Sequence, residues 1–503
     1  MTDTQVAPTG ADAATGAVEH FDVLIVGAGI SGIGGAYHLQ DQCEGKTFTI
    51  LETQASFGGT WRTHKYPGIR SDSDLYTFGY RFKPWTGTPI ATAAEIRKYM
   101  GEVIEQNDIA RHIKYQHTIT NAVWSSSDKQ WTIHATRTDT NERVLFTCNF
   151  LWMCQGYYRH TGPYTPTWPG MDSFAGPIVH PMEWPEDLDY RGKKVVVIGS
   201  GATAATIIPA MAPDCEHITM LQRSPTFFFP GRNVDEMAEE LRALEIDETW
   251  IHEIVRRRRL KEQGDIAAAS EAFPEVVREE LYNGIREVMG EDYDLSPHFT
   301  PSYRPWQQRI ALVPDGDLFH AIKGGSASVV TDHIDSFAEG GIKLKSGEFI
   351  EADIIITATG FNMSVLGDVE FDIDGEPLNF GERVTYRGAM FAGIPNMSWV
   401  FGYFRASWTL RADLLGDFVC RLLKHMDNKS ATVVVPQLRD EDADMVLGPW
   451  VDPENFNPGY ISRSLHLMPH QGDKDPWRHA QDYWTEKTEL PKADLDDGTL
   501  RYS

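Results

Sequence analysis

The sequence predicts an α/β protein with two Rossmann-like dinucleotide-binding domains and a helical insertion. An apolar run, a glycine-rich turn and a helical stretch occur at 21–39 and again at 194–211, and further apolar runs follow at 48–51 and 217–221. Strand–helix–strand units of this kind form parallel sheets, so two separated units indicate two sheets. The stretch 234–289 is charged with helical periodicity and predicts the insertion. Within it, the run of arginines at 256–259 is interpreted as a solvated helix face.

The first glycine turn has the residues that a dinucleotide pyrophosphate requires. Gly27 lets the chain turn off the strand, Gly29 lets the pyrophosphate approach the backbone, and Gly32 lets helix and strand pack closely. Glu52 lies 20 residues after Gly32, at the end of the next strand, where a carboxylate binds ribose hydroxyls. The N-terminal position and the glutamate favour FAD or NAD over NADP.

The second glycine turn differs at two positions. Its third small residue is Ala204, and its second strand ends in Arg223 instead of a carboxylate. A guanidinium at this position suits the 2′-phosphate of NADP, because its planar fork makes paired hydrogen bonds. The residues expected to contact NADP are Gly199, Gly201, Ala202, Thr203, Arg223 and Ser224.

Bulk properties exclude several classes of protein. The net charge of −26 repels phosphate backbones and anionic lipids, so no nucleic acid is expected as a partner. The five cysteines form no C-x-x-C pair, which argues against a disulfide scaffold, a metal site and a dithiol redox centre. Residues 1–20 are interpreted as a flexible tail, and no apolar run is long enough to span a bilayer. A cytoplasmic location is the default expectation, and the oligomeric state is not predicted.

Two dinucleotide sites in one chain favour a flavin that accepts hydride from NADPH. The reduced flavin then reduces a disulfide, passes electrons to a partner, or reacts with dioxygen. The segment 58–72 contains no cysteine, which removes the first of these options.

A linker between the two glycine units matches a known fingerprint. Phe174, Gly176, His180, Trp184 and Pro185 fit F-x-G-x-x-x-H-x-x-x-W-P at every fixed position. This resembles the fingerprint of Baeyer–Villiger monooxygenases. Related flavin enzymes that oxygenate nitrogen or sulfur carry Tyr or Phe where this chain has Trp184.

A second motif is similar to that family as well. The residues that fit G-x-W-x(4)-[FY]-P-G-x(3)-D are Gly59, Trp61, Tyr66, Pro67, Gly68 and Asp72. The resemblance extends from about residue 21 to 477 and is greatest to the branch of ethionamide-activating and long-chain ketone monooxygenases. It implies FAD contacts at Gly59, Thr60, Trp61 and Asp72, and cofactor contacts at the interdomain turns Gln155, Thr359 and Gly360.

The resemblance also implies the reaction and its catalytic pair. Ketones become esters or lactones with NADPH and O2 through a C4a-peroxyflavin; the alternative is oxygenation of sulfides or amines. Arg309 matches the family's active arginine, which stabilises the peroxide anion, and Asp72 matches the carboxylate that orients it. Asp74 is the alternative partner if the register slips by two. The family often has Lys-Arg where this chain has Gln308 and Arg309, so preference for NADPH depends more on Arg223.

Three further side chains have open roles. His180 and Trp184 would share a face if helical, and they either couple NADP movement to the flavin or serve packing alone. Trp61 is expected to cover the flavin, with core packing as the alternative. Trp408 resembles a residue on the substrate side.

The expected domain organisation follows the two glycine turns. The predicted boundaries are 1–157 and 351–503 for the FAD domain and C-terminal arm, 158–230 and 306–350 for the NADP domain, and 231–305 for the helical insertion. The expected partners are a small ketone or sulfide and O2.

Overall fold

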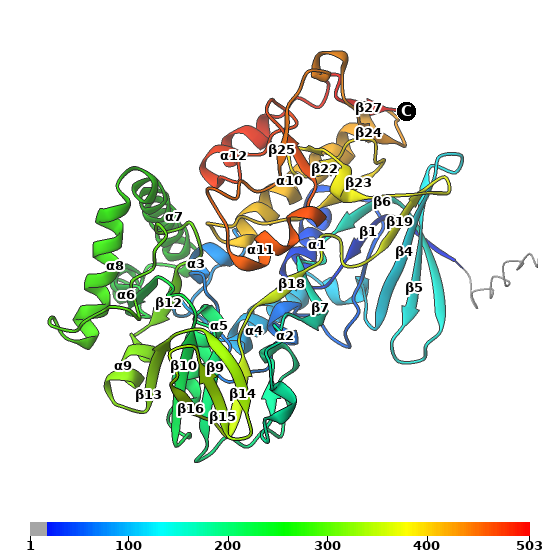
Figure 1. The fold of residues 1–503 in the computed structure, drawn as a ribbon. Coiled ribbons are helices and arrows are strands. Elements are labelled where there is room, and N and C mark those ends of the chain that lie inside the picture. Colours follow the sequence, from blue (N-terminus) through cyan, green and yellow to red (C-terminus); the bar gives the residue numbers. More distant parts are fainter. Residues whose placement is uncertain (1–17) are drawn as a thin grey trace, which may run out of the picture.

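The larger of the two main sheets forms the body of the N-terminal domain (Figure 1). The computed structural model describes residues 18–503, so most of the predicted N-terminal tail lies outside it. The sheet has the order β20-β19-β4-β5-β6-β1-β2-β3, and β23 pairs with β6. Its parallel centre consists of β1 (Glu19–Val26), β2 (Phe48–Leu51) and β6 (Arg143–Met153), with β23 (Met397–Trp399) beside β6. The remaining strands are β3 (Ile113–Lys114), β4 (His117–Ser125), β5 (Gln130–Arg137), β19 (Glu370–Ile373) and β20 (Glu376–Pro377).

Helices from both ends of the chain pack beside this sheet. The glycine turn leads into α1 (Ile30–Gln42), which contacts α10 (Trp408–Asn428). Along this contact, His38 Nε2 lies 3.2 Å from the Asp413 carboxylate. Shorter helices follow α1: α2 (Thr60–Thr63), α3 (Leu75–Phe78) and α4 (Ala93–Gln106). The chain therefore returns to its first domain after residue 358, as the sequence predicts in outline.

The second sheet has the order β13-β10-β9-β17-β8 and is parallel throughout. Its strands are β8 (Ile178–Val179), β9 (Lys194–Ile198), β10 (His217–Gln222), β13 (Ala327–Thr331) and β17 (Ile354–Thr357). α5 (Ala202–Met211) and α9 (Asp317–Lys323) pack together beside it. The predicted boundary at 350 is wrong, because β17 pairs along its length with β9 inside this sheet. The sequence permits the error, since four buried apolar residues suit either sheet.

The predicted insertion is helical and consists of α6 (Glu236–Ala243), α7 (Glu248–Ala272) and α8 (Pro274–Met289), drawn in green in Figure 1. The interpretation of 256–259 as a solvated face is wrong at Arg256, which is buried. Its Nη1 donates to the carbonyl oxygens of Tyr76, Thr77 and Gly79 at 2.8–3.2 Å. These carbonyls lie at the end of α3, where a helix leaves acceptors unpaired within itself, so a buried cation there is favourable.

An antiparallel ribbon crosses between the two sheets. β7 (Tyr158–Pro163) pairs with β18 (Phe361–Met363), and α11 (Gly459–Ser464) contacts β18. The C-terminal arm continues through α12 (Tyr483–Glu489) to β27 (Leu500–Tyr502). Arg411 of α10 is fully buried and pairs with Glu486 of α12 at 2.8 Å, which anchors this arm.

The cysteines are mostly buried thiols. All five cysteines are free, and four are buried. Within residues 18–503, no group of three or more His, Cys, Asp or Glu side chains is arranged to hold a metal ion. In the same range, no helix combines the length and apolar character that a membrane span requires.

Candidate cofactor cleft

A cleft with a cavity of about 450 Å3 lies between the two sheets. Both domains contribute to its lining, from the first glycine turn through α5 to the ribbon β7. Of the residues singled out in the sequence, the lining includes Gly27, Gly29, Glu52, Gly59, Thr60, Trp61, Asp72, Gln155, Ala202, Thr203, Arg309 and Trp408. The structure therefore brings most of the predicted FAD contacts and both predicted catalytic residues to one cleft.

The first glycine turn has the conformation that its motif predicts. Gly27 has φ of +96°, and a Cβ on Gly32 would stand 1.9 Å from the Gly27 carbonyl oxygen. Only glycine fits either position. Glu52 lines the cleft, and its two oxygens accept the backbone N–H groups of Ala28 and Gln54 at 2.7 and 2.8 Å. Burial raises the pKa of Glu52, whose carboxylate ties the turn to the end of β2.

The second glycine turn is open toward solvent. Gly199 has φ of +127°, and a Cβ there would stand 2.3 Å from the Ala358 carbonyl oxygen, whereas a Cβ on Gly201 would meet nothing within 4 Å. Arg223 and Ser224 follow β10 and are exposed. Arg223 has no hydrogen bond or ion pair to any residue in 18–503, so its guanidinium is free to bind an anion.

The predicted catalytic pair is in contact. Arg309 Nη1 donates to Asp72 Oδ2 at 2.6 Å across 237 positions of sequence, and the side chains are 32% and 38% exposed, toward the cleft that they line. Burial raises the pKa of Asp72, but the Arg309 guanidinium outweighs it and holds that pKa below its usual value. The carboxylate in turn keeps the pKa of Arg309 raised despite burial. Both groups are charged at neutral pH.

Asp74 makes a separate set of contacts. Its side chain accepts the Tyr76 N–H as the N-cap of α3, and it pairs with Arg259 of the insertion at 3.2 Å. The geometry thus separates the two aspartates, with Asp72 facing the cleft arginine and Asp74 facing the helical insertion.

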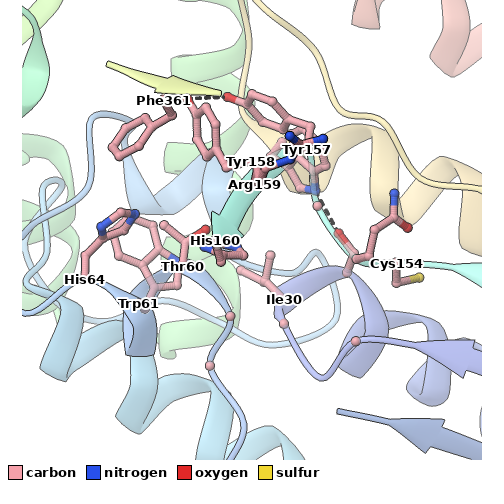
Figure 2. Close-up of a pocket in the computed structure, with 18 of the residues that line it drawn as sticks. Ile30, Thr60, Trp61, His64, Cys154, Tyr157, Tyr158, Arg159, His160 and Phe361 are labelled. Atoms are coloured by element: carbon pink, nitrogen blue, oxygen red, sulfur yellow. Dashed lines mark hydrogen bonds between the residues drawn. The ribbon is translucent and has the colours of Figure 1, made fainter. Parts of the chain in front are cut away.

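Aromatic side chains form one wall of the cleft (Figure 2). Trp408 donates from Nε1 to Ser31 Oγ at 2.7 Å and stacks on Tyr157 with ring centroids 5.1 Å apart. Trp61 lies at the other side of the cleft, edge-on to Phe78 at 5.7 Å. Both tryptophans are therefore held by contacts to other residues that line the same cleft.

The linker fingerprint lies beside the second sheet and does not line the cleft. A Cβ on Gly176 would stand 2.0 Å from the Asp353 carbonyl oxygen, which explains the glycine, and Phe174 is buried. His180 caps a 3₁₀ turn, accepting the Met182 N–H at Nδ1 and lying 3.1 Å from the Gly360 carbonyl oxygen through Nε2. The segment is not α-helical, so His180 and Trp184 do not share a helix face.

Two turns connect the domains, one at Gln155 and one at Thr359 and Gly360. Gln155 lines the cleft and donates to the Val365 carbonyl at 2.9 Å. Thr359 donates to the Tyr164 carbonyl at 2.6 Å, and Gly360 has φ of +103°. The two turns are thus fastened where the chain crosses between the domains.

Sequence reasoning missed the residues that hold the segment 66–72 against the second domain. Tyr66 is buried in the core of that domain, and a Cβ on Gly68 would stand 2.6 Å from Ala210 Cβ on α5. Arg70 pairs with Asp317 at 2.5 Å, close to Asp72 in sequence. The spacing of the second motif is the only sequence signal for them, and it does not reveal their partners.

Comparison with known proteins covers nearly the whole chain. The chain is 44% identical over 487 residues to the FAD-containing monooxygenase EthA of Mycobacterium tuberculosis, a match that spans 96% of this chain and 98% of that protein. It is 42% identical over 487 residues to a probable FAD-binding monooxygenase, AlmA, of an Acinetobacter species, with 96% of each chain covered.

The chain belongs to the family of FAD-containing monooxygenases. Within this monooxygenase, residues 25–87 match the family model of NAD(P)-binding Rossmann-like domains, and 89–236 match that of flavin-binding monooxygenase-like proteins. Its fold is similar to that of a steroid monooxygenase bound to NADP, with a TM-score of 0.73, 23% identity, and 96% and 99% of the two chains covered. An open cyclohexanone monooxygenase has a TM-score of 0.67 at 20% identity, with 84% and 90% covered.

Proposed function

We propose that this FAD-containing monooxygenase is a Baeyer–Villiger enzyme that converts ketones to esters or lactones. The balanced reaction consumes a ketone, NADPH, a proton and O2, and gives the ester, NADP+ and water. The observation that carries the proposal is the Asp72–Arg309 pair, with its 2.6 Å contact and its place in the lining of the cleft between the two glycine turns.

The two glycine turns fit the two cofactors. The first turn leaves room for a pyrophosphate at Gly29 and Gly59, whose Cα atoms approach so closely that a Cβ on Gly59 would stand 3.1 Å from Gly29 Cα. We assign FAD to this turn and NADPH to the second, where Arg223 is free. Bound FAD, reduced by NADPH, supplies the activation of dioxygen.

Arg309 has the charge and position to stabilise negative charge on oxygen. A guanidinium fixed in advance lowers the energy of an oxyanion that develops beside it, and removal of one such donor in other enzymes costs about 2.7–4 kcal/mol. Asp72 holds Arg309 in one orientation and balances its charge in the cleft. Within residues 18–503, Asp72 is the only hydrogen-bond partner of the Arg309 guanidinium, so part of the guanidinium remains able to bind an acceptor in the cleft.

Trp61 and Trp408 are proposed to limit water in the cleft. Each has a large apolar ring and lines the cleft, where Trp61 contacts Phe78 and Trp408 contacts Ser31. Less water slows loss of activated oxygen as hydrogen peroxide. We propose no catalytic step for His180, whose two nitrogens both have partners.

Oxygenation of sulfides or amines is a second candidate. The match of residues 89–236 to flavin-binding monooxygenase-like proteins favours it, because that description is not restricted to ketone oxidation. The Trp184 fingerprint, by its resemblance to ketone oxidisers, favours the first candidate.

A product assay separates the two candidates. The purified holoenzyme is given NADPH and 18O2 with phenylacetone or with thioanisole, and products are identified by mass spectrometry. Ester with one 18O atom, formed in equal amount to the NADPH consumed, supports the proposal. Formation of sulfoxide alone, with no ester from any of a panel of ketones, contradicts it.

A further inference from the structure

Two tyrosines line the cleft beside the catalytic pair. Tyr157 and Tyr158 lie where the first domain passes into β7, and their ring centroids are 4.1 Å apart. Tyr157 stacks on Trp408, and Tyr158 packs against Phe361 of β18 at 4.7 Å, as Figure 2 shows for the second pair. Because each ring has an aromatic neighbour, the fold sets the positions of both hydroxyl groups.

The two hydroxyls form a directed hydrogen-bond chain. The Tyr157 hydroxyl donates to the Tyr158 oxygen at 2.8 Å. A phenol has one proton to donate, and no acceptor among residues 18–503 takes the proton of Tyr158. A hydroxyl that already accepts a hydrogen bond becomes a stronger donor, so the bond from Tyr157 polarises the free O–H of Tyr158.

The electrostatics of the cleft keep this donor protonated. Burial raises the pKa of Tyr158, and the nearby positive charge of Arg309 offsets only part of that rise. The phenol is therefore neutral at pH 7. The neutral O–H of Tyr158 lines the same cleft as the Arg309 guanidinium, which is near enough to lower the pKa of that phenol.

We propose that the Tyr158 hydroxyl is a second hydrogen-bond donor, beside Arg309, for the oxygen acceptor of the substrate, and that Tyr157 positions and polarises it. The site then selects substrates that carry an exposed carbonyl-type oxygen over apolar compounds of the same shape, because an unpaired O–H in the cleft is costly. The inference rests on the proposed function only in placing the substrate in this cleft.

Binding of a matched ligand pair tests the donor directly. Methyl phenyl sulfoxide has a strong oxygen acceptor, and thioanisole has the same skeleton without it. The Kd of each is measured on the oxidised FAD holoenzyme from changes in flavin absorbance. In Tyr158→Phe the sulfoxide Kd should rise about 5–10-fold, as for loss of one hydrogen bond of roughly 1–1.4 kcal/mol, while the thioanisole Kd stays within about twofold. Tyr157→Phe should weaken the sulfoxide by a smaller factor.

Tyr460 provides the matched control. Its ring lies 6.0 Å from that of Tyr158 and 6.3 Å from that of Tyr157, but it is absent from the cleft lining. Tyr460→Phe should leave both Kd values unchanged. Flavin content and Tm are measured for all three variants to confirm that the comparison concerns folded holoenzyme.

Three results would overturn the proposal. They are an unchanged sulfoxide Kd in Tyr158→Phe, an equal loss in Tyr460→Phe, and no preference for sulfoxide over thioanisole in the unaltered enzyme. Because binding to oxidised enzyme requires no oxygen transfer, absence of ester formation would count against the proposed function and would leave this result intact.

Discussion

Arg223→Ala tests the assignment of the second glycine turn to NADPH. Arg223 is exposed, follows β10 directly and has no partner within residues 18–503, so its removal should disturb no folded contact. A hydrogen bond to a charged group contributes about 1.5–3 kcal/mol. Solvent screens an exposed guanidinium, so we take the lower end, about 1.5 kcal/mol, or a roughly tenfold loss.

The assay is the steady-state rate of flavin reduction with NADPH and with NADH. We expect kcat/KM for NADPH to fall about tenfold through KM, and kcat/KM for NADH to stay within about twofold, since NADH lacks the 2′-phosphate. The difference in kcat/KM for NADPH between the unaltered enzyme and Arg223→Ala should shrink as the salt concentration is raised. Arg232→Ala is the control, because Arg232 is also exposed but pairs with Glu236. Equal losses with NADPH and NADH in Arg223→Ala would refute the phosphate role.

The remaining predictions concern the turns, the C-terminal arm and pH. Gly32→Ala should purify without FAD, because its Cβ would stand 1.9 Å from a carbonyl oxygen. Gly201→Ala, with open space at its Cβ, should keep FAD and lose NADPH-dependent reduction. The absorbance of bound flavin distinguishes the two variants, and FAD retained by Gly32→Ala would contradict the packing argument. Glu486→Gln should lower the free energy of unfolding, measured by urea titration, by about 3–5 kcal/mol, because it leaves Arg411 buried without its anion. A loss below about 1 kcal/mol would show that the ion pair is dispensable. Burial lowers the pKa of His252 to about 4, so the folded state binds fewer protons than the unfolded state between pH 6.5 and 4, and stability should fall as pH falls through that window. His252→Gln, which can still accept the Trp85 N–H, should show a shallower fall, and an unchanged slope would contradict the assignment.

The two glycine turns and the catalytic pair could be predicted because local rules and motif spacing constrain them. Gly27 requires a positive φ and Gly32 a close helix–strand approach, and both requirements are visible in one short segment. Asp72 and Arg309 lie 237 residues apart, and only the resemblance to a known family joined them.

Other features depend on tertiary contacts that no local pattern reveals. Arg256 looks like its three neighbours in sequence, and only the position of α3 makes it a buried donor to carbonyl groups. The strand β17 was assigned to the wrong domain because an apolar run does not identify its neighbours. Glu52 stands where the motif requires it, and its contacts to the backbone N–H groups of Ala28 and Gln54 could not be read from the motif.

The central claim is that Arg309, oriented by Asp72, stabilises negative charge on oxygen during ester formation, and Arg309→Ala measures it most directly. We predict that the variant binds FAD and is reduced by NADPH under anaerobic conditions, but forms ester from phenylacetone at least about 100-fold more slowly, as for loss of one oxyanion donor. Ester formation within about threefold of the unaltered enzyme would contradict the claim.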